Sequence, residues 1–102
     1  MNEYENVPEH VDFVAKRLFE NMGELSNGSV IRVEKGGGGP TSDHFHEHDH
    51  LFIIMKGEAK VIIEGRAFIV KENESIRVPG NKSHSIWNNL DDTMVMVGLS
   101  VI

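Results

Sequence analysis

Short runs of apolar and β-branched residues, separated by turn residues, fill the chain from residue 29 onward. Runs of this kind, bounded by Gly, Pro, Asn and Asp, are typical of β-strands. The connections between them are too short for the crossovers that parallel strands need. The pattern therefore predicts an all-β chain of antiparallel strands in a sandwich or barrel, with strands at SVIRVEK, LFIIMK, AKVIIE, RAFIV, SIRV, HSIWN and TMVMVGLSVI.

The connections have distinct turn chemistry. Residues 56–58 (Lys-Gly-Glu) and 64–66 (Glu-Gly-Arg) are predicted as tight hairpin turns, residues 79–81 (Pro-Gly-Asn) as a sharp bend, and residues 88–92 as a polar loop. The run of four glycines before Pro40 is expected to hold no regular structure and to form a loop that enters a site. It lacks the Lys-Ser/Thr that would follow in a phosphate-binding loop.

The N-terminal part is less regular. Within residues 11–22 the β-branched content is modest, and a helical stripe fits the apolar positions Val11, Val14, Leu18 and Met22. Helix and strand both stay open for this segment. We predict two regions: residues 1–28 as an arm, a strand or a short helix that packs on the barrel or on a partner subunit, and residues 29–102 as the β-barrel.

Composition and charge exclude several partners. The 102 residues carry a net charge of −6, and the basic residues alternate with acids and form no basic patch, so neither nucleic acid nor an anionic membrane is an expected partner. No stretch approaches the ~20 apolar residues that span a bilayer, and the acidic N-terminus does not resemble a secretory signal. We therefore expect a cytoplasmic protein. The absence of cysteine restricts a transition-metal site to imidazole, carboxylate and water.

Histidines are concentrated in one short segment. Four of the six lie within residues 44–50, and His84 follows in a distant predicted strand. Two histidines at positions i and i+2 of a strand point to the same side, so His44 and His46 can bind one ion together. Two alternatives stay open: dense histidines can form a solvated metal-scavenging tract, and a lone histidine such as His84 is usually a hydrogen-bonded structural residue.

The spacing of these residues resembles the two motifs of the cupin family, over residues 38 to 88. The first motif is matched by Gly38, His44, His46, His50 and Gly57, with His50 standing where the family usually has glutamate. The second motif is matched by Asn73, Pro79, Asn81, His84 and Asn88, with asparagine in place of both glycines. Asparagine accepts the left-handed backbone angles of a turn, so these replacements are compatible with the motif.

The resemblance implies a double-stranded β-helix, or jelly-roll barrel, of the cupin (RmlC-like) type. It implies one divalent metal ion per chain, held by His44, His46, His50 and His84. The departure at position 50 is similar to the small group of four-histidine cupins, some of which are associated with manganese. Ligand type leaves manganese, iron, nickel, zinc and copper open. His48 is expected to lie in a turn and face away from the ion, and His10 is assigned no role.

Strand alternation gives candidate residues for a cavity. With His50 and His84 facing inward, the inward positions that follow them on the same strands are Phe52, Ile54, Ile86 and Asn88. Most of these positions are expected to be barrel core. Candidate anchors for an anion are Arg32 and Arg77. Candidates for a pocket mouth or a subunit interface are Phe45, Trp87, Met94 and Met96.

Four neutral imidazoles leave the charge of a divalent ion uncompensated by the protein, which favours an acidic or enolisable ligand. A six-coordinate ion would keep two positions open. The leading hypothesis is therefore a metal-dependent enzyme, oxygenase-like, acting on a small chelating oxygen-rich substrate, with isomerase or lyase chemistry also open and no catalytic side chain identified. The alternatives are a non-catalytic module that binds or senses a small molecule, and metal storage by the histidine segment.

Small cupins are often homodimers, so the resemblance also implies a homodimer in which the N-terminal segment contributes to the partner's sheet. The long apolar final run, residues 93–102, fits this expectation, since it would otherwise form an exposed, adhesive sheet edge.

Overall fold

The computed structural model describes residues 3–42 and 47–102, and every regular element in these ranges is a β-strand. His44, His46 and Phe45 lie outside the described residues. The seven runs predicted as strands are confirmed, and two further strands precede them. The elements are β1 (Glu5–Asn6), β2 (Val11–Met22), β3 (Leu25–Gly39), β4 (His50–Lys56), β5 (Glu58–Ile63), β6 (Arg66–Lys71), β7 (Ser75–Val78), β8 (His84–Asn88) and β9 (Met94–Val101).

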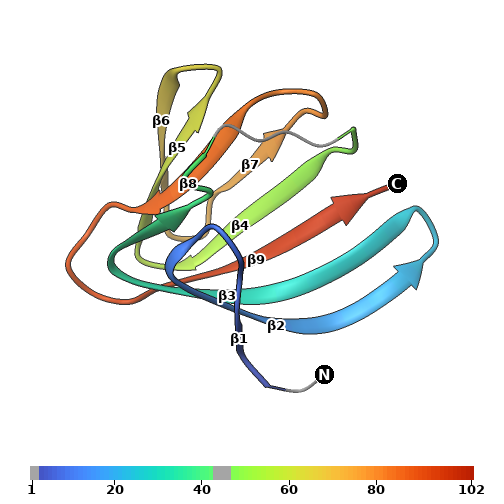
Figure 1. Ribbon diagram of the computed structural model, residues 1–102, viewed down its shortest axis with the longest axis horizontal. Coiled ribbons are helices and arrows are strands. Elements are labelled where there is room, and N and C mark those ends of the chain that lie inside the picture. Colours follow the sequence, from blue (N-terminus) through green and yellow to red (C-terminus); the bar gives the residue numbers. More distant parts are fainter. Residues whose placement is uncertain (1–2, 43–46) are drawn as a thin grey trace.

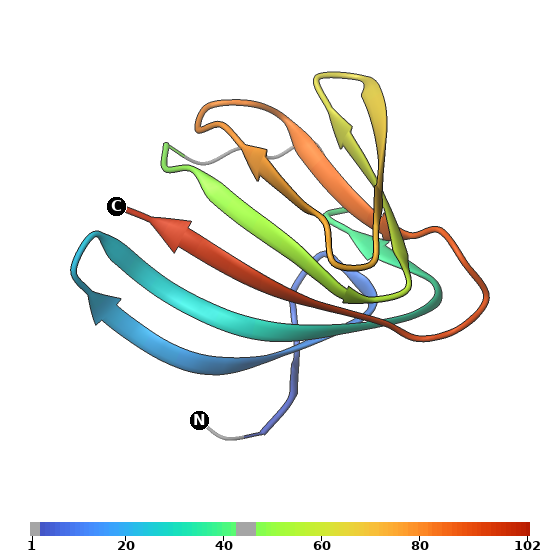
Figure 2. The ribbon, with the colours of Figure 1, turned by 180° about the vertical axis from the view of Figure 1, so that it is seen from behind.

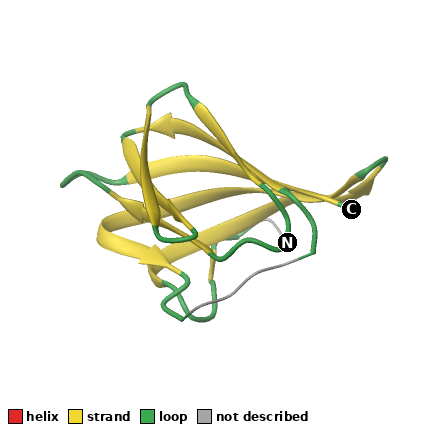
Figure 3. Ribbon diagram, turned by 90° about the horizontal axis from the view of Figure 1, so that it is seen from above, coloured by secondary structure: helices red, strands yellow, loops and turns green. Residues whose placement is uncertain are grey.

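The strands form one antiparallel nine-stranded sheet that folds over on itself (Figure 1). The order is β6-β5-β8-β3-β9-β4-β7, and β2 adds to β3 and carries β1. β6 and β7, at the two ends of this order, contact one another, so the barrel is nearly closed. The curvature that brings the two layers together is visible from behind and from above (Figures 2 and 3). The predicted double-stranded β-helix, or jelly-roll barrel, is confirmed.

The last strand lies inside the sheet. β9 pairs with β3 on one side, from Met94 to Val101, and with β4 on the other, from Val95 to Ser100. The expectation that the final run would form an exposed edge is therefore wrong. A strand with two neighbours satisfies all of its backbone hydrogen bonds within the chain, so this strand needs no partner subunit to cover its backbone.

Residues 11–22, for which helix and strand were both open, form strand β2, which pairs with β3 of the same chain. Three of the four residues of the supposed helical stripe face solvent, since Val11 is 41% exposed, Leu18 50% and Met22 59%, whereas Val14 is half-buried. The buried position is instead Phe13, in the core of the barrel. Residues 11–22 are therefore a strand because they pair with β3, although the spacing of their apolar residues resembles that of a helix.

The glycine run was predicted to lack regular structure, and this is wrong, because β3 continues through Gly39. Gly38 and Gly39 pair with Trp87 and Ile86 of β8. A Cβ atom on Gly38 would lie 2.5 Å from the backbone oxygen of Ile86 and 2.5 Å from the indole of Trp87. Glycine is therefore required here because the backbone of β3 packs directly against β8, and no side chain fits between the two strands.

Two turn predictions have opposite outcomes. Glu64 and Gly65 join the paired strands β5 and β6, and both have a positive φ, of 48° and 79°, as a tight type I′ hairpin requires. The other predicted hairpin, residues 56–58, is wrong. There the chain passes from β4 to β5, which do not pair: β4 pairs with β7 and β9, and β5 with β6 and β8. Gly57, with φ of 91°, marks a corner between the two layers.

The core lies between the two layers. Six side chains are almost wholly enclosed: Ile54, Met94, Met96, Val33, Val61 and Val78. No helix in the described ranges is long and apolar enough to cross a membrane.

Candidate metal centre

Two of the four predicted ligands are described by the structure, and each is the first residue of a strand. His50 begins β4 and His84 begins β8. These strands belong to different layers, since β4 pairs with β7 and β9 whereas β8 pairs with β3 and β5. The fold nevertheless brings the two imidazoles together, with ring centroids 5.4 Å apart. The other two predicted ligands, His44 and His46, lie outside the described residues.

The separation of the two rings is compatible with a shared ion. With a metal–nitrogen bond of ~2.1 Å, an imidazole centroid lies about 3.2 Å from the ion, so two ligands at a right or tetrahedral angle have centroids roughly 4.5–5.2 Å apart. The observed 5.4 Å is close to this range. Within residues 3–42 and 47–102, no group of three or more histidine or carboxylate side chains gathers at one point. The described part of the chain therefore supplies a pair of nitrogen donors.

Hydrogen bonds orient both rings. Nδ1 of His84 donates to the backbone oxygen of Lys82, at 3.0 Å, because a carbonyl can only accept. This bond places the proton on Nδ1, which is the tautomer whose Nε2 can bind a metal. Nδ1 of His50 lies 3.1 Å from the hydroxyl oxygen of Ser100, and its Nε2 is buried. Such partners fix the tautomer and the rotation of ligating imidazoles in metalloproteins.

His48 contacts the ring of His50. Its ring centroid lies 5.0 Å from that of His50, in an edge-on arrangement, and the expectation that it faces away from an ion stays a prediction. The residue lies just before β4 and is partly buried. Phe52 stacks against the same ring, with centroids 5.8 Å apart. The ring of His50 therefore has both an imidazole and an aromatic neighbour.

Asp49 is a functional candidate that sequence reasoning missed. Its Oδ1 accepts the backbone N–H of Gly80 at 2.8 Å, and its Oδ2 accepts Nε–H of Arg77 at 2.9 Å. The bond from Gly80 and then the bond from Arg77 hold the pKa of the Asp49 carboxyl below its ordinary value of 3.8. No sequence signal connects residues this far apart in the chain, and only the pairing of β4 with β7 reveals the contact.

A cavity of about 180 Å³ opens beside His50 on the inner face of the sheet. The polar residues Asn27, Ser29 and Ser100 line it together with His50. The apolar walls come from β2, β3, β4, β9 and the segment between β1 and β2: Val7, Phe13, Ala15, Ile31, Phe52 and Gly98. Pockets for drug-sized ligands are usually about 300–1,000 Å³, so this cavity suits a small molecule. Gly98 keeps it open, because a Cβ there would lie 3.0 Å from Ile31 and 3.3 Å from Phe52.

The predicted pocket residues have different positions. All four inward predictions, Phe52, Ile54, Ile86 and Asn88, are confirmed as buried, but Phe52 is the one that lines the cavity beside His50. Asn88 instead donates from its side-chain amide to the backbone oxygens of Val33 (2.9 Å) and Asp92 (2.8 Å). It is a structural residue that ties β8 to β3 and to the following loop.

Both arginines predicted as anion anchors point away from the barrel interior, and neither lines the cavity beside His50. Arg32 is next to two inward residues of β3 and therefore points outward, where it contacts Glu34 at 3.9 Å and the Tyr4 ring. Arg77 has a side chain that is 72% exposed and is paired with Asp49. Strand alternation explains both results, because the residues on either side of Arg32 (Ile31 and Val33) and of Arg77 (Ile76 and Val78) pack in or against the core.

The residues predicted for a pocket mouth or a subunit interface differ in their burial. Met94 and Met96 are fully buried, so neither lines a mouth nor forms an interface. Trp87 lies at the surface side of β8 and donates from its indole nitrogen to the hydroxyl oxygen of Ser85, at 3.0 Å. It lines a second cavity, of about 410 Å³, which also borders His84. Phe45 lies outside the described residues.

The curated relatives of this chain are mannose-1-phosphate guanylyltransferases. The enzyme of Sinorhizobium fredii is 44% identical over 76 residues, which cover 74% of this chain and 12% of that protein. The enzyme of Salmonella montevideo is 35% identical over 68 residues, which cover 67% of this chain and 14% of that protein. The chain therefore spans about one eighth of the length of these relatives, 12–14%, and the similarity concerns one part of them.

Solved structures agree on the architecture. The cupin domain of Schizosaccharomyces pombe Cnp3 superposes with a TM-score of 0.82 at 16% identity, over 97% of this chain and 67% of that one. The polyketide cyclase RemF of Streptomyces resistomycificus superposes with a TM-score of 0.81 at 20% identity, over 97% and 72%. At such identities the likeness concerns the fold alone. A family model described as a cupin domain matches residues 29–102, and the chain therefore belongs to the cupin family.

Proposed function

We propose that this chain binds one divalent metal ion through His44, His46, His50 and His84, and that the ion acts on a small oxygen-rich molecule held in the adjoining cavity. One observation carries the proposal. Imidazoles from two layers of the barrel lie 5.4 Å apart, and one of them, that of His50, lines the cavity of about 180 Å³. When bound, the ion would act as a Lewis acid toward a chelating oxygen ligand, and several imidazole-binding metals also support oxygen chemistry.

The chain's own residues would prepare the site. The carbonyl of Lys82 keeps the proton of His84 on Nδ1, so that Nε2 would be the nitrogen that binds the metal. Ser100 fixes the ring of His50. Asn27 and Ser29 supply hydrogen-bonding groups for the polar part of a ligand, while Phe52 and the other apolar walls exclude water from its remaining atoms.

Metal binding is the first part to test. Titration of the metal-free chain with Zn²⁺ or Mn²⁺ should reach one ion per chain. His84→Ala should abolish tight binding, since a donor from the second layer is lost. His48→Ala is the comparison variant. Its ring contacts that of His50, but His48 is not one of the four proposed ligands, so tight binding should remain. The reverse result, or several ions per chain, would support metal storage by the histidine segment and contradict the proposal.

The reaction is the second part. Incubation of the metal-loaded chain with diketones, catechols, hydroxy acids and sugar phosphates, in air and without oxygen, should consume a substrate only in air if the activity is that of an oxygenase. Turnover in both conditions would instead indicate isomerase or lyase chemistry. In either case His84→Ala should be inactive.

A non-catalytic binding or sensing module is the second candidate, and one observation favours it. Among the described residues that line the cavity beside His50, none is a carboxylate, a lysine or an arginine. Apart from the imidazole, no proton-transfer group is therefore at hand there. Such a module would bind one of the compounds above in a metal-dependent manner and release it unchanged, which calorimetry together with product analysis would detect.

A further inference from the structure

One carboxylate connects the two segments that carry His50 and His84. Asp49 directly precedes His50, and its Oδ1 accepts the backbone N–H of Gly80 at 2.8 Å, across 31 residues of sequence. Its Oδ2 accepts Nε–H of Arg77 at 2.9 Å, in β7. The start of β4 is thereby fastened to the turn between β7 and β8, which leads to His84.

The same two segments are in direct backbone contact. A Cβ atom at Gly80 would collide with the carbonyl oxygen of Glu47 and would lie 2.8 Å from its carbonyl carbon. Glycine is therefore required at position 80 for the turn to lie flat on residues 47–48. This contact and the carboxylate bonds are independent observations, and both place the turn at one fixed distance from the start of β4.

The turn in its own right orients His84. Asn81, with φ of 61°, reverses the chain after Gly80. Lys82 then presents its backbone oxygen to Nδ1 of His84, at 3.0 Å. A displacement of the turn would move this carbonyl and release the imidazole from its tautomer and rotation. Asp49 is therefore connected to the His84 imidazole through two backbone groups of the turn: the N–H of Gly80, which it binds, and the C=O of Lys82, which binds His84.

We propose that Asp49 is a positioning residue that holds the His50 and His84 imidazoles in the relative geometry a shared metal ion needs, with Arg77 and Gly80 as its partners. This inference rests on the proposed metal site. Stability is a weak reason for the arrangement, because Arg77 is largely exposed and exposed ion pairs contribute little to the free energy of folding. The consequence of the contact is geometric.

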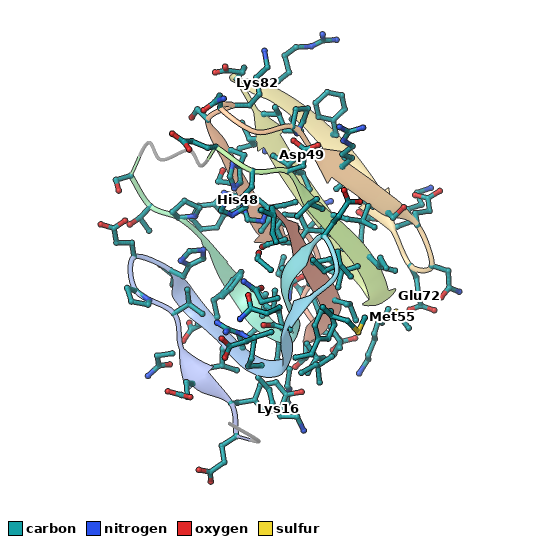
Figure 4. All side chains as sticks on the ribbon, turned by 90° about the vertical axis from the view of Figure 1, so that its right-hand side faces the viewer. Lys16, His48, Asp49, Met55, Glu72 and Lys82 are labelled. Carbon is teal, nitrogen blue, oxygen red and sulfur yellow. The ribbon has the colours of Figure 1, made fainter. Side chains whose placement is uncertain are left out.

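A matched control lies at the other end of the barrel. Oε1 of Glu72 accepts the backbone N–H of Gly57 at 3.2 Å, so it too joins a carboxylate to a glycine in a distant turn. Figure 4 shows Glu72 near Met55, at the opposite end of β4 from His48 and Asp49. Glu72→Ala removes a bond of the same kind without touching the segments that carry His50 and His84.

The experiment measures Co²⁺ affinity of the full chain by competition with a chelator, together with the visible spectrum of bound Co²⁺. Asp49→Ala should weaken binding about 10–100-fold, the usual effect of losing a partner that orients a ligand, and should alter the spectrum. Asp49→Asn should recover part of the affinity, since its amide oxygen can still accept the Gly80 N–H. Glu72→Ala should bind Co²⁺ as the unmodified chain does.

A second readout needs no metal. In the metal-free chain at alkaline pH, the nitrogen chemical shifts of His84 should report a proton on Nδ1, and Asp49→Ala should give a mixture of tautomers. If Asp49→Ala keeps both the Co²⁺ affinity of Glu72→Ala and the single tautomer, the positioning role is refuted and the metal site stands. If the unmodified chain binds no Co²⁺, the proposed metal site is refuted, and with it the role of Asp49 as a residue that positions metal ligands.

Discussion

The two ends of the barrel are built from the same strands but differ in the side chains that face inward. Along β4 and β9 the paired inward residues are His50 with Ser100 at one end, then Phe52 with Gly98, then Ile54 with Met96 at the other. The first pair is polar, and the last pair is fully buried. We call these the open end and the closed end. Their difference shows that alternation defines the inner face, whereas residue size and polarity along that face decide where a cavity forms.

The closed end holds the well-packed part of the core. Among the described residues, the buried amide at this end is that of Asn88, and it donates hydrogen bonds to two backbone carbonyls. The open end has polar groups and an unfilled volume beside His50. The atoms that line a cavity lack packing contacts and therefore contribute less to stability. Most of the stabilising packing is at the closed end. We expect substitutions at the closed end to change the free energy of unfolding, and substitutions at the open end to change binding.

The largest effect is expected at the closed end. Ile54 lies on β4, which pairs with β7 and β9, and its side chain is fully buried in the core. Ile54→Ala should lower the free energy of unfolding by about 2–5 kcal/mol, through lost burial and the remaining cavity. Urea denaturation of the metal-free chain measures this change. The stoichiometry of metal binding should stay the same in the folded variant. A loss below about 1 kcal/mol would show that the closed end is loosely packed, which would contradict the comparison.

The next effect concerns the open end in the presence of metal. An ion that binds the folded chain alone should stabilise it by about 2.7 kcal/mol at a free concentration of 100 Kd. In His84→Ala this stabilisation should vanish, while the stability of the metal-free variant should differ little from that of the unmodified chain. Thermal denaturation with and without Zn²⁺ measures both quantities. An equal metal-induced shift in His84→Ala would remove this histidine from the site.

Asn88 allows a test of a polar residue at the closed end. Asn88→Ala leaves the carbonyl oxygens of Val33 and Asp92 without their amide donor, and this should cost about 1–3 kcal/mol of unfolding free energy. Metal affinity should be unaffected, although the family motif includes this position. A fall in Co²⁺ affinity with little loss of stability would instead assign Asn88 to the site.

The smallest effect compares one added carbon at each end. Val33→Ile adds a methylene to a fully buried position and should cost about 1–3 kcal/mol through overpacking. Gly98→Ala adds a methyl group that faces the cavity, 3.0 Å from the flexible end of Ile31, and should cost less. It should, however, weaken the binding of any ligand in the cavity, which a titration with the oxygen-rich compounds above would detect. Equal destabilisation by the two changes would mean that the cavity has no spare volume.

Much of the architecture could be predicted, because short β-branched runs and turn residues are local signals. The seven strands and the turn at Glu64–Gly65 follow from such signals. The predictions that failed depend on pairing between distant strands. Residues 56–58 resemble a hairpin, but β4 and β5 lie in different layers. The glycine run resembles a loop, but β8 packs directly against it.

For the candidate site, the sequence identified the histidines and their inward neighbours, because motif spacing and strand alternation are properties of the chain itself. It could not show that Arg77 pairs with Asp49 or that Gly80 lies on the backbone of Glu47. These contacts join residues that are neighbours only after β4 pairs with β7.

The sequence by itself determined that this chain is an antiparallel β-barrel of the cupin family and that its candidate metal ligands are imidazoles, since both depend on the order and spacing of residues along the chain. The tertiary structure decided which end of the barrel stays open and which arginines face solvent. It also decided that a carboxylate binds the two segments carrying His50 and His84. Those features depend on which strands lie side by side, and that is set by the packing of the whole chain.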